Sequence, residues 1–386
     1  MVTAVQLKRG KLILLFLVSL CLLGVGVIMG IRSFLVGHGE AYGVSREIPW
    51  GILISTYVFW AGLSCGLSVT SAVGHLLHNR PLGAIGARSV FLAIATIFAG
   101  FLAIGLELEN PWRLPIWVAL SPNLRSNIWW MGTLYTVYVI LLLLEFTLMT
   151  LGKHKASART GLLAGLSDIA AFSNLGAVFA LLAAHPFWYG TYIPTFFIPS
   201  ALMNGAAAII FFTWLAYRLS EREMEPEVVQ GLQVAGKIYG FTIAICIFFL
   251  GWKIAASIAG KPYGSWEAIM ALLKGPLAFN FWVFEVCLGL VIPLLVIIGV
   301  RARDINAMAY VGGLSLIAAF VMRYDQVVAG QLVPHYAHMH IYGLPQYYHY
   351  APSLCEWLIV IGSLGLFGAL FAWGEMAFKG HPPVHH

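Results

Sequence analysis

Charged residues are scarce in this sequence. Only 10% of its 386 residues are Asp, Glu, Lys or Arg, whereas 60% are hydrophobic and the mean hydropathy is +0.85. Soluble domains carry about 25% charged residues, so this composition indicates an integral membrane protein. The polar segments between the apolar ones leave no room for a soluble catalytic domain. Any chemistry on a water-soluble substrate must therefore be supplied by partner subunits.

Cysteine motifs are also absent. An iron–sulfur or zinc site needs clustered thiolates such as CxxC, so we expect neither in this chain, and we expect the thiols to pack as small hydrophobic side chains. The formal charge of +6 is better explained by membrane topology than by nucleic-acid binding, and no nucleic-acid partner is expected. The five cysteines stand alone in or beside apolar segments: Cys21, Cys65, Cys246, Cys287 and Cys355.

Ten apolar segments are long enough to cross a bilayer, which takes about 20 helical residues. The first follows three basic residues, but it is too long for the apolar region of a signal peptide and lacks a small-residue cleavage site. We therefore expect a retained signal anchor. The ten segments are residues 12–36, 50–78, 85–107, 127–151, 163–185, 192–219, 230–259, 277–300, 304–329 and 354–378.

The predicted fold is an all-α membrane protein with two four-helix bundles. Span two contains TYVFWAGLSCG and span six contains FFIPSALMNGA, each an aromatic start followed by small residues. This weak repeat predicts similar bundles in residues 50–185 and 192–329, with spans one and ten peripheral. Internal repeats are common in membrane proteins, so the repeat does not separate a transporter from an electron-transfer anchor.

Basic residues are unevenly distributed between the loops. With the N-terminus inside, fourteen of the 22 lysines and arginines fall on the inner side and seven on the outer side, and Arg323 remains within span nine. Because Lys and Arg accumulate on cytoplasmic loops, we predict an inner-membrane protein with both termini in the cytoplasm. The last outer loop, 330–353, is uncharged, and we expect it to pack under a partner or to shape a cavity. Its histidines are His335, His338, His340 and His349.

Polar side chains inside membrane segments are costly, and they are therefore candidates for function. In spans two to five, one set lies near the predicted outer end and another lies deeper or toward the inner side. The second bundle and the last span have their own ionisable groups. The outer set is Tyr57, Glu107, Glu109, Trp130, Tyr135, Tyr138 and His185; the deeper set is Ser173, Asn174, Glu145 and Asp168; the second-bundle and last-span groups are Glu285, Arg323, Asp325 and Glu356.

The outer set has the groups that a quinone site requires. These are hydrogen-bonding side chains for two carbonyl oxygens, apolar or aromatic walls, and a carboxylate that takes the protons released by quinol. Glu107 is the predicted base. In the alternative interpretation the tyrosines anchor the chain at the interface and His185 caps its helix before Pro186. Arg323 and Asp325 are expected to pair, with Glu285 nearby, as an ion network or a proton conduit.

The twelve histidines raise the question of haem. Two histidines that share a haem must lie at matching depth on facing helices, and His75 and His185 are at opposite ends of their spans. Other pairs remain possible as haem ligands, namely His75 or His78 with His154, and His38 with His185. They lack partners in the middle of a span. We expect no haem, although a haem-b quinol cytochrome stays an alternative, as does a secondary transporter with a midplane site.

Several stretches, in order over nearly the whole chain, resemble one family. They are WAGLSCG in span two, LELENPWR after span three, SPNLRSNIWWMGTLYTVYVILLLLE in span four, SNLGAVFALLAAHPFWYGTYIPTFFIPSALMNG across spans five and six, and YAPSLCEWLIVIGSLG in the last span. They resemble the membrane subunits of the NrfD/polysulfide-reductase type, which include HybB-like hydrogenase anchors. With RYDQVVAGQLVP before the last span, the ten-span form is most similar to the membrane subunit of DsrMKJOP and Hmc/Hme-type complexes. Relatives often have His-Gln before the serine of span five, where this chain has Ala171 and Phe172.

The resemblance implies a quinone-reactive membrane subunit of an anaerobic respiratory or sulfur-metabolising oxidoreductase complex. Its first bundle would hold exchangeable menaquinone, with no haem or iron–sulfur cluster in this chain. A ferredoxin-like iron–sulfur subunit would dock on the outer face, and further redox subunits would be of the multihaem cytochrome, molybdopterin or hydrogenase type. The chain would exchange electrons between menaquinol and the iron–sulfur subunit.

We accordingly expect a quinone site and a proton pathway. Tyr57, Tyr135 and Asn174 would hydrogen-bond the quinone beside Ser173, Trp130 would wall its ring, and His185 would lie near. Protons would leave to the outside through Glu107 and Glu109, and Glu145 and Asp168 are candidates for an inward route. Glu285, Arg323 and Asp325 would extend the pathway through the second bundle.

Overall fold

The computed structural model describes residues 2–76, 79–335, 339 and 342–378, and every regular element in these ranges is a helix. Ten helical segments are long and apolar enough to cross a membrane, which confirms the all-α, ten-span prediction. Three histidines named above, His78, His338 and His340, lie outside the described residues, as does the side chain of His75. The spanning helices are α1 (Val2–Val36), α3 (Ile52–Leu76), α4 (Arg80–Glu107), α6 (Asn127–Thr150), α7 (His154–Ala180), α8 (Tyr192–Ser220), α9 (Pro226–Gly260), η1 (Asn280–Val291) continued by α11 (Ile292–Gly299), α12 (Ile305–Leu332) and α13 (Leu354–Phe378).

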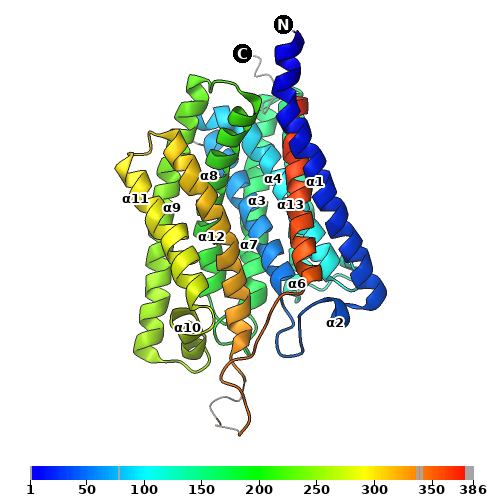
Figure 1. Ribbon diagram of the computed structural model, residues 1–386, viewed down its shortest axis with the longest axis vertical. Coiled ribbons are helices and arrows are strands. Elements are labelled where there is room, and N and C mark those ends of the chain that lie inside the picture. The colour runs from blue at the N-terminus through cyan, green and yellow to red at the C-terminus, as the bar shows by residue number, and fades with distance from the viewer. Residues whose placement is uncertain (1, 77–78, 336–338, 340–341, 379–386) are drawn as a thin grey trace.

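Three short helices connect the spans at one end of the molecule. They are α2 (His38–Ala41), α5 (Arg113–Leu120) and α10 (Ser265–Leu273). Helix α1 begins, and α13 ends, at the opposite end (Figure 1). We call this opposite end the terminal end, and the end with the three short helices the distal end. An even number of spans places the start of the first and the end of the last on the same side.

The predicted grouping agrees with the packing. Helices α3, α4, α6 and α7 pack together, as do α8, α9, η1/α11 and α12, while α1 and α13 pack on each other at the edge (Figure 1). The fifth span differs from its predicted boundaries at both ends. Helix α7 begins nine residues earlier than 163 and ends at Ala180, so His185 lies in the following loop and does not cap a helix before Pro186.

Helix α3 is the central element of the molecule. It is buried on almost every side, as expected of a mainly apolar helix with neighbours all round, and it contacts both α7 of the first bundle and α8 and α12 of the second. A Cβ at Gly66 would overlap the Ala201 carbonyl oxygen of α8, and one at Gly205 would overlap Gly66 itself. The two small-residue segments of the weak repeat therefore lie against each other, because glycine allows close approach of membrane helices.

Buried carboxylates fix the peripheral helix α13. At the distal end Glu356, fully buried, accepts hydrogen bonds from the backbone N–H of Gly43 (2.7 Å) and Ser353 (2.8 Å) and from the Tyr350 hydroxyl (2.5 Å). Tyr350 in turn accepts a bond from the N–H of Ile52 (2.8 Å) at the start of α3. This carboxylate therefore joins the loops that lead into α3 and α13.

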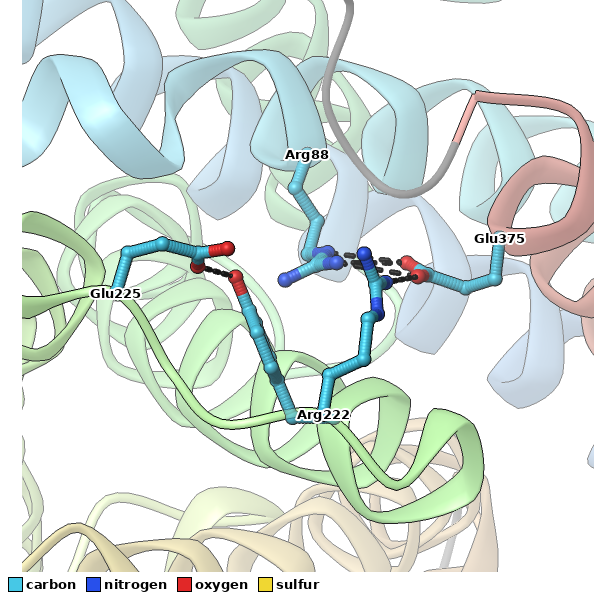
Figure 2. A network of polar contacts seen from close by, with 5 residues as sticks. Arg88, Arg222, Glu225 and Glu375 are labelled. Atoms are coloured by element: carbon cyan, nitrogen blue, oxygen red, sulfur yellow. Dashed lines mark hydrogen bonds and ion pairs between the residues drawn. The ribbon is translucent and has the colours of Figure 1, made fainter. Parts of the chain in front are cut away.

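At the terminal end a second buried carboxylate has cationic partners (Figure 2). Arg88 of α4, 2% exposed, donates through Nε and Nη2 to Glu375 of α13 at 3.0 and 3.1 Å, and Arg222 lies 3.6 Å from the same carboxylate. Both guanidinium groups lie over the Tyr217 ring, whose hydroxyl donates to Glu225. The network links α4, α8, the α8–α9 loop and α13, and removing one charge of such a buried pair costs about 3–5 kcal/mol.

Candidate functional site

An open cleft lies at the distal end of the first bundle, where the chain leaves α4 and re-enters through α6. Its volume is about 420 Å³, within the range of roughly 300–1,000 Å³ found for small-molecule pockets. Helix α5 lies across it and contributes apolar side chains and an indole. The polar and aromatic groups on its walls are Glu109, Asn110, Arg113, Asn123, Trp117 and Trp129.

One of two adjacent tryptophans fixes α5 to the start of α6. The indole N–H of Trp129 donates to the Val118 carbonyl of α5 at 2.8 Å, while Ser126 caps α6 by accepting a bond from the Trp129 backbone N–H (3.3 Å). The Trp130 indole instead donates to the Leu124 carbonyl (3.0 Å) and is 38% exposed. Trp129 therefore lines the cleft, whereas Trp130, the residue that we chose from the sequence, lies outside it.

Two predicted carboxylates lie beside the cleft. Glu109 is exposed on its wall. Glu107 ends α4, and its Oε2 is buried without a hydrogen-bond partner among the described residues. His38 of α2 is close enough to Glu109 to feel its charge, but burial lowers the pKa of His38 from its ordinary value. The Tyr42 hydroxyl fixes the end of α2 to the end of α4 by donating to the Leu106 carbonyl at 2.5 Å.

A cluster of buried tyrosines lies below the cleft. Tyr57 of α3 and Tyr135 of α6 are each 3% exposed, with ring centroids 6.1 Å apart, and the Tyr138 ring follows 6.5 Å from Tyr135. The Tyr138 hydroxyl is 2.7 Å from that of Ser64. The Tyr135 hydroxyl, by contrast, makes no hydrogen bond of ordinary geometry within the described part of the chain. A polar ligand in contact with Tyr135 would satisfy it, since an unpaired buried hydroxyl is costly.

Asp168 of α7 lies against this cluster. It is fully buried, neither carboxylate oxygen accepts a well-formed hydrogen bond from the described residues, and Tyr57, Tyr135 and Tyr138 are all within electrostatic reach. Its neighbours include Ser64, halfway along α3. Asp168 therefore lies near the middle of the bundle, deeper than the inner-side position that we expected.

Comparison with known proteins decides the family. Residues 41–335, about three quarters of the chain, match the family described as polysulphide reductase, NrfD. The chain belongs to the NrfD family.

Similar proteins of this family cover most of the chain. The integral membrane subunit of the Hdr-like menaquinol oxidoreductase of Archaeoglobus fulgidus is 24% identical over 91% of this chain and 90% of its own length. A protein named as part of the selenate reductase of Mesobacillus selenatarsenatis is 22% identical over 89% and 90%. Protein NrfD of Escherichia coli is 26% identical over 74% of this chain and 96% of its own.

The remaining predicted ligands of this NrfD-family chain lie in two places. Asn174 donates from Nδ2 to the Asn127 carbonyl at 2.9 Å and so lies level with the start of α6, with Ser173 beside it, both half-buried. His185 is on the side of the second bundle, with Nδ1 2.8 Å from the Gly330 carbonyl and its ring 5.1 Å from that of His335. Burial and the neighbouring His335 lower the pKa of His185.

Glu145 of α6 lies about two turns toward the terminal end from Tyr138. It is 1% exposed, accepts a hydrogen bond from Ser71 at 3.3 Å, and lies against Gly161 of α7, where an added Cβ would overlap it. Tyr57, Tyr138 with Asp168, and Glu145 thus form a line of polar side chains along the first bundle, between α3, α6 and α7.

The NrfD-family chain has a second buried polar cluster between α9, η1 and α12. A small cavity of about 20 Å³ is bordered by Lys253, Glu285 and Asp325, which is room for about one water molecule. Asp325 accepts a hydrogen bond from Asn280 at 3.0 Å, and its Oδ2 is buried without a partner among the described residues. Glu285 lies within the π-helix η1, a rare conformation often found at functional sites.

Arg323 does not pair with Asp325. Residues two apart on a helix point away from each other, and Arg323 instead donates to Ser200 of α8 (2.6 Å) and to Gln326 (2.8 Å). Its guanidinium also lies over the rings of Phe172 and Phe197, at 5.5 and 4.5 Å from their centroids. Phe172 thus packs against the central arginine at the junction of the bundles.

The sequence analysis did not identify three of the residues that line the cleft. Arg113 was noted only as part of a resemblance, and Trp117 and Trp129 were overlooked among thirteen tryptophans. The proline-marked start of α5 was the available signal for an interfacial helix. Within the described ranges no three His, Cys, Asp or Glu side chains are grouped as metal ligands, and the five cysteines are free thiols, three of them buried.

Proposed function

We propose that this chain is the quinone-reactive membrane subunit of a respiratory oxidoreductase complex. It exchanges electrons between menaquinol or menaquinone in the bilayer and an iron–sulfur subunit at the distal end. The similar Archaeoglobus protein is named as a subunit of a menaquinol oxidoreductase, and the selenate reductase protein of Mesobacillus supports a respiratory setting. The observation that carries the proposal is the 420 Å³ cleft at the distal end of the bundle that contains Tyr135, a buried tyrosine whose hydroxyl makes no well-formed hydrogen bond among the described residues.

In this proposal the quinone head group lies between the cleft and the tyrosine cluster. Tyr57 and Tyr135 hydrogen-bond its oxygens, while Asn174 with Ser173 supports the start of α6. Trp129 walls the ring, with Trp130 behind it. An apolar pocket with a few convergent polar groups is the usual form of such a site.

Quinol oxidation releases two electrons and two protons, and these need separate routes. The electrons pass to the iron–sulfur partner, because this chain has no ligand cluster of its own among the described residues. The protons pass to the carboxylates beside the cleft, Glu107 and then Glu109, which is exposed to water. A carboxylate within reach of the leaving proton is a suitable general base.

An inward proton route uses the line of polar groups in the first bundle. Asp168 would receive protons from the terminal side through Glu145 and the hydroxyls between them. In the second bundle, Glu285, Asp325 and the bordering Lys253 surround a water-sized cavity, and Arg323 lies between the bundles. These groups form the second half of the proposed pathway, while His185, on the far side near His335, contributes to the distal surface.

The proposed setting is the inner membrane. The excess of basic residues on the terminal-end loops supports cytoplasmic termini, which makes the distal end the outer face. There a ferredoxin-like iron–sulfur subunit would cover the cleft, and further subunits of the multihaem cytochrome, molybdopterin or hydrogenase type would complete the complex.

Gentle purification of the native complex tests this function. We expect an iron–sulfur subunit to co-purify and a quinone analogue to bind in competition with menaquinone. Matched Tyr57→Phe and Tyr135→Phe variants should weaken that binding, whereas Tyr310→Phe, on an exposed ring of α12, should not. A chain that purifies alone and binds no analogue would overturn the proposal.

A further inference from the structure

The first bundle has a weak seam on its outer surface. Helix α4 packs closely on α3, and α6 on α7, but α4 and α6 touch each other over a much shorter length. The distal cleft is bordered by Leu108 and Glu109, which directly follow α4, and by Ile128 and Trp129 of α6. The seam therefore continues from the cleft toward the middle of the bundle.

Both helices lack a side chain one turn below the cleft. On α4, Phe101 and Gly105 share one face because they are four apart. A Cβ built at Gly105 would meet nothing within 4 Å. On α6, Gly132 lies one turn below Ile128, and Val118 of α5 covers it at 3.0 Å. We call the two side-chain gaps, at Gly105 of α4 and at Gly132 of α6, the notch.

A row of aromatic rings leads from the outer surface of α4 to the buried tyrosines. Phe98 of α4 is 38% exposed, and its ring lies 6.3 Å from that of Phe101, which is 6.2 Å from Tyr135, all in edge-to-face contact. Tyr135 is 3% exposed, and its hydroxyl has no well-formed hydrogen bond among the described residues. Phe101 thus separates the apolar outer surface from an unsatisfied buried donor.

From this arrangement we propose that the seam between α4 and α6 is the lateral entrance for the substrate, and that Phe101 is its gate. The inference rests on the proposed quinone function and names the route. The flat ring passes the notch and displaces Phe101 to reach Tyr135, and the polyprenyl chain stays in the notch beside Gly105. A tail-bearing quinone is insoluble in water, so it must enter from the apolar side, whereas a tail-less quinol also reaches the cleft from water.

Substitutions at Gly105 test the entrance, because added atoms there occupy open space and should not disturb the fold. The native complex is reconstituted in lipid vesicles, and quinol oxidation is followed with long-chain menaquinol and with menadiol, which has no tail. For Gly105→Leu we expect kcat/KM to fall about tenfold or more with menaquinol but about twofold or less with menadiol. Gly105→Ala should lie between the wild type and Gly105→Leu.

The matched control is Gly83→Leu. Gly83 lies on the same helix near its terminal end, and a Cβ there also meets nothing within 4 Å. It should leave both substrates unaffected, and each variant must retain its partner subunits on purification. An equal loss with both substrates, or no loss with either, would overturn the entrance while leaving the proposed function intact. A wild-type complex that neither oxidises these quinols nor reduces the corresponding quinones would overturn the proposed function itself.

Discussion

The Tyr138 hydroxyl lies 2.7 Å from the Ser64 hydroxyl, and Asp168 lies beside them with no well-formed hydrogen bond of its own among the described residues. The three side chains come from α6, α3 and α7 and meet near the middle of the first bundle. Buried ionisable groups in membrane helices are expensive, and they mark proton routes more often than packing sites. This contact is therefore the natural midpoint of the proposed inward route.

Proton translocation should depend on this route. Asp168→Asn combined with Glu145→Gln removes both carboxyl groups while keeping their size. Reconstituted complex with this double variant should still exchange electrons with quinone, but the uptake of protons from the terminal side that accompanies menaquinone reduction should fall to the level of an uncoupled control. Glu227→Gln, an exposed carboxylate at the same end, is the matched control. Unchanged proton uptake in the double variant would remove the inward route.

Quinol turnover should depend on the buried tyrosines. Tyr57→Phe and Tyr135→Phe each remove one hydroxyl from a ring that remains packed. A net hydrogen bond contributes about 0.5–1.5 kcal/mol, so we expect about a threefold to tenfold fall in kcat/KM for each. Quinol oxidation by purified complex measures this effect, with Tyr310→Phe as the control. Full activity in both tyrosine variants would show that the quinone head group binds elsewhere in the cleft.

Stability should depend strongly on the pair of Arg88 and Glu375. Arg88→Met leaves a buried carboxylate with one weaker partner, and we expect a loss of about 3–5 kcal/mol, seen as a lower midpoint in thermal unfolding. Lys11→Met breaks an exposed pair with Glu221 and should cost less than about 1 kcal/mol. Arg88→Met with Glu375→Met should recover much of the loss. If Arg88→Met and Lys11→Met destabilise equally, the network has no special role.

The contact between α3 and α8 should tolerate no added carbon. Gly66→Ala would place a Cβ against the backbone of Ala201, and such overpacking costs about 1–3 kcal/mol or more. Gly24→Ala in α1, where a Cβ meets nothing within 4 Å, is the control and should be neutral or slightly stabilising. Thermal unfolding distinguishes them, and equal midpoints would show that the two helices can separate without cost.

The pH dependence of stability should carry a contribution from His185. Burial lowers its pKa in the folded chain, so below about pH 6.5, its ordinary value, the unfolded chain binds more protons than the folded one. Stability from this residue is therefore complete above that pH and is lost as the pH falls. Wild type should lose more stability than His185→Gln between about pH 7.5 and 5.5. His349→Gln, at an exposed position, is the control, and parallel curves for all three proteins would contradict the assignment.

Most of the fold was predictable because membrane helices obey a length and hydropathy rule. All ten spans were located, and several boundaries agree within a few residues, as in the last span, predicted as 354–378 and observed as Leu354–Phe378. The start of α7 was missed because His154 to Arg159 are polar and basic, although they continue the helix beyond the apolar segment. The π-helix at Asn280 was also unpredictable, since its composition does not differ from that of an α-helix.

Less of the candidate site was predictable. Tyr57, Tyr135 and Glu107 lie where depth arguments placed them, near the distal end, because depth follows from position along a span. Rotation about the helix axis does not follow from position, which is why Trp130 was chosen over its neighbour Trp129. Partners across helices were equally inaccessible: Arg323 was assigned to Asp325 by proximity in sequence, whereas its contacts come from Ser200 on another helix.

The most direct test of the central claim is electron exchange between menaquinol and the iron–sulfur centres of the purified native complex, followed by electron paramagnetic resonance without oxygen. Our account predicts that menaquinol reduces these centres, or that menaquinone reoxidises them after chemical reduction. It also predicts that the Tyr57→Phe/Tyr135→Phe double variant slows this exchange without loss of any subunit. An intact wild-type complex whose centres exchange no electrons with either form would contradict it.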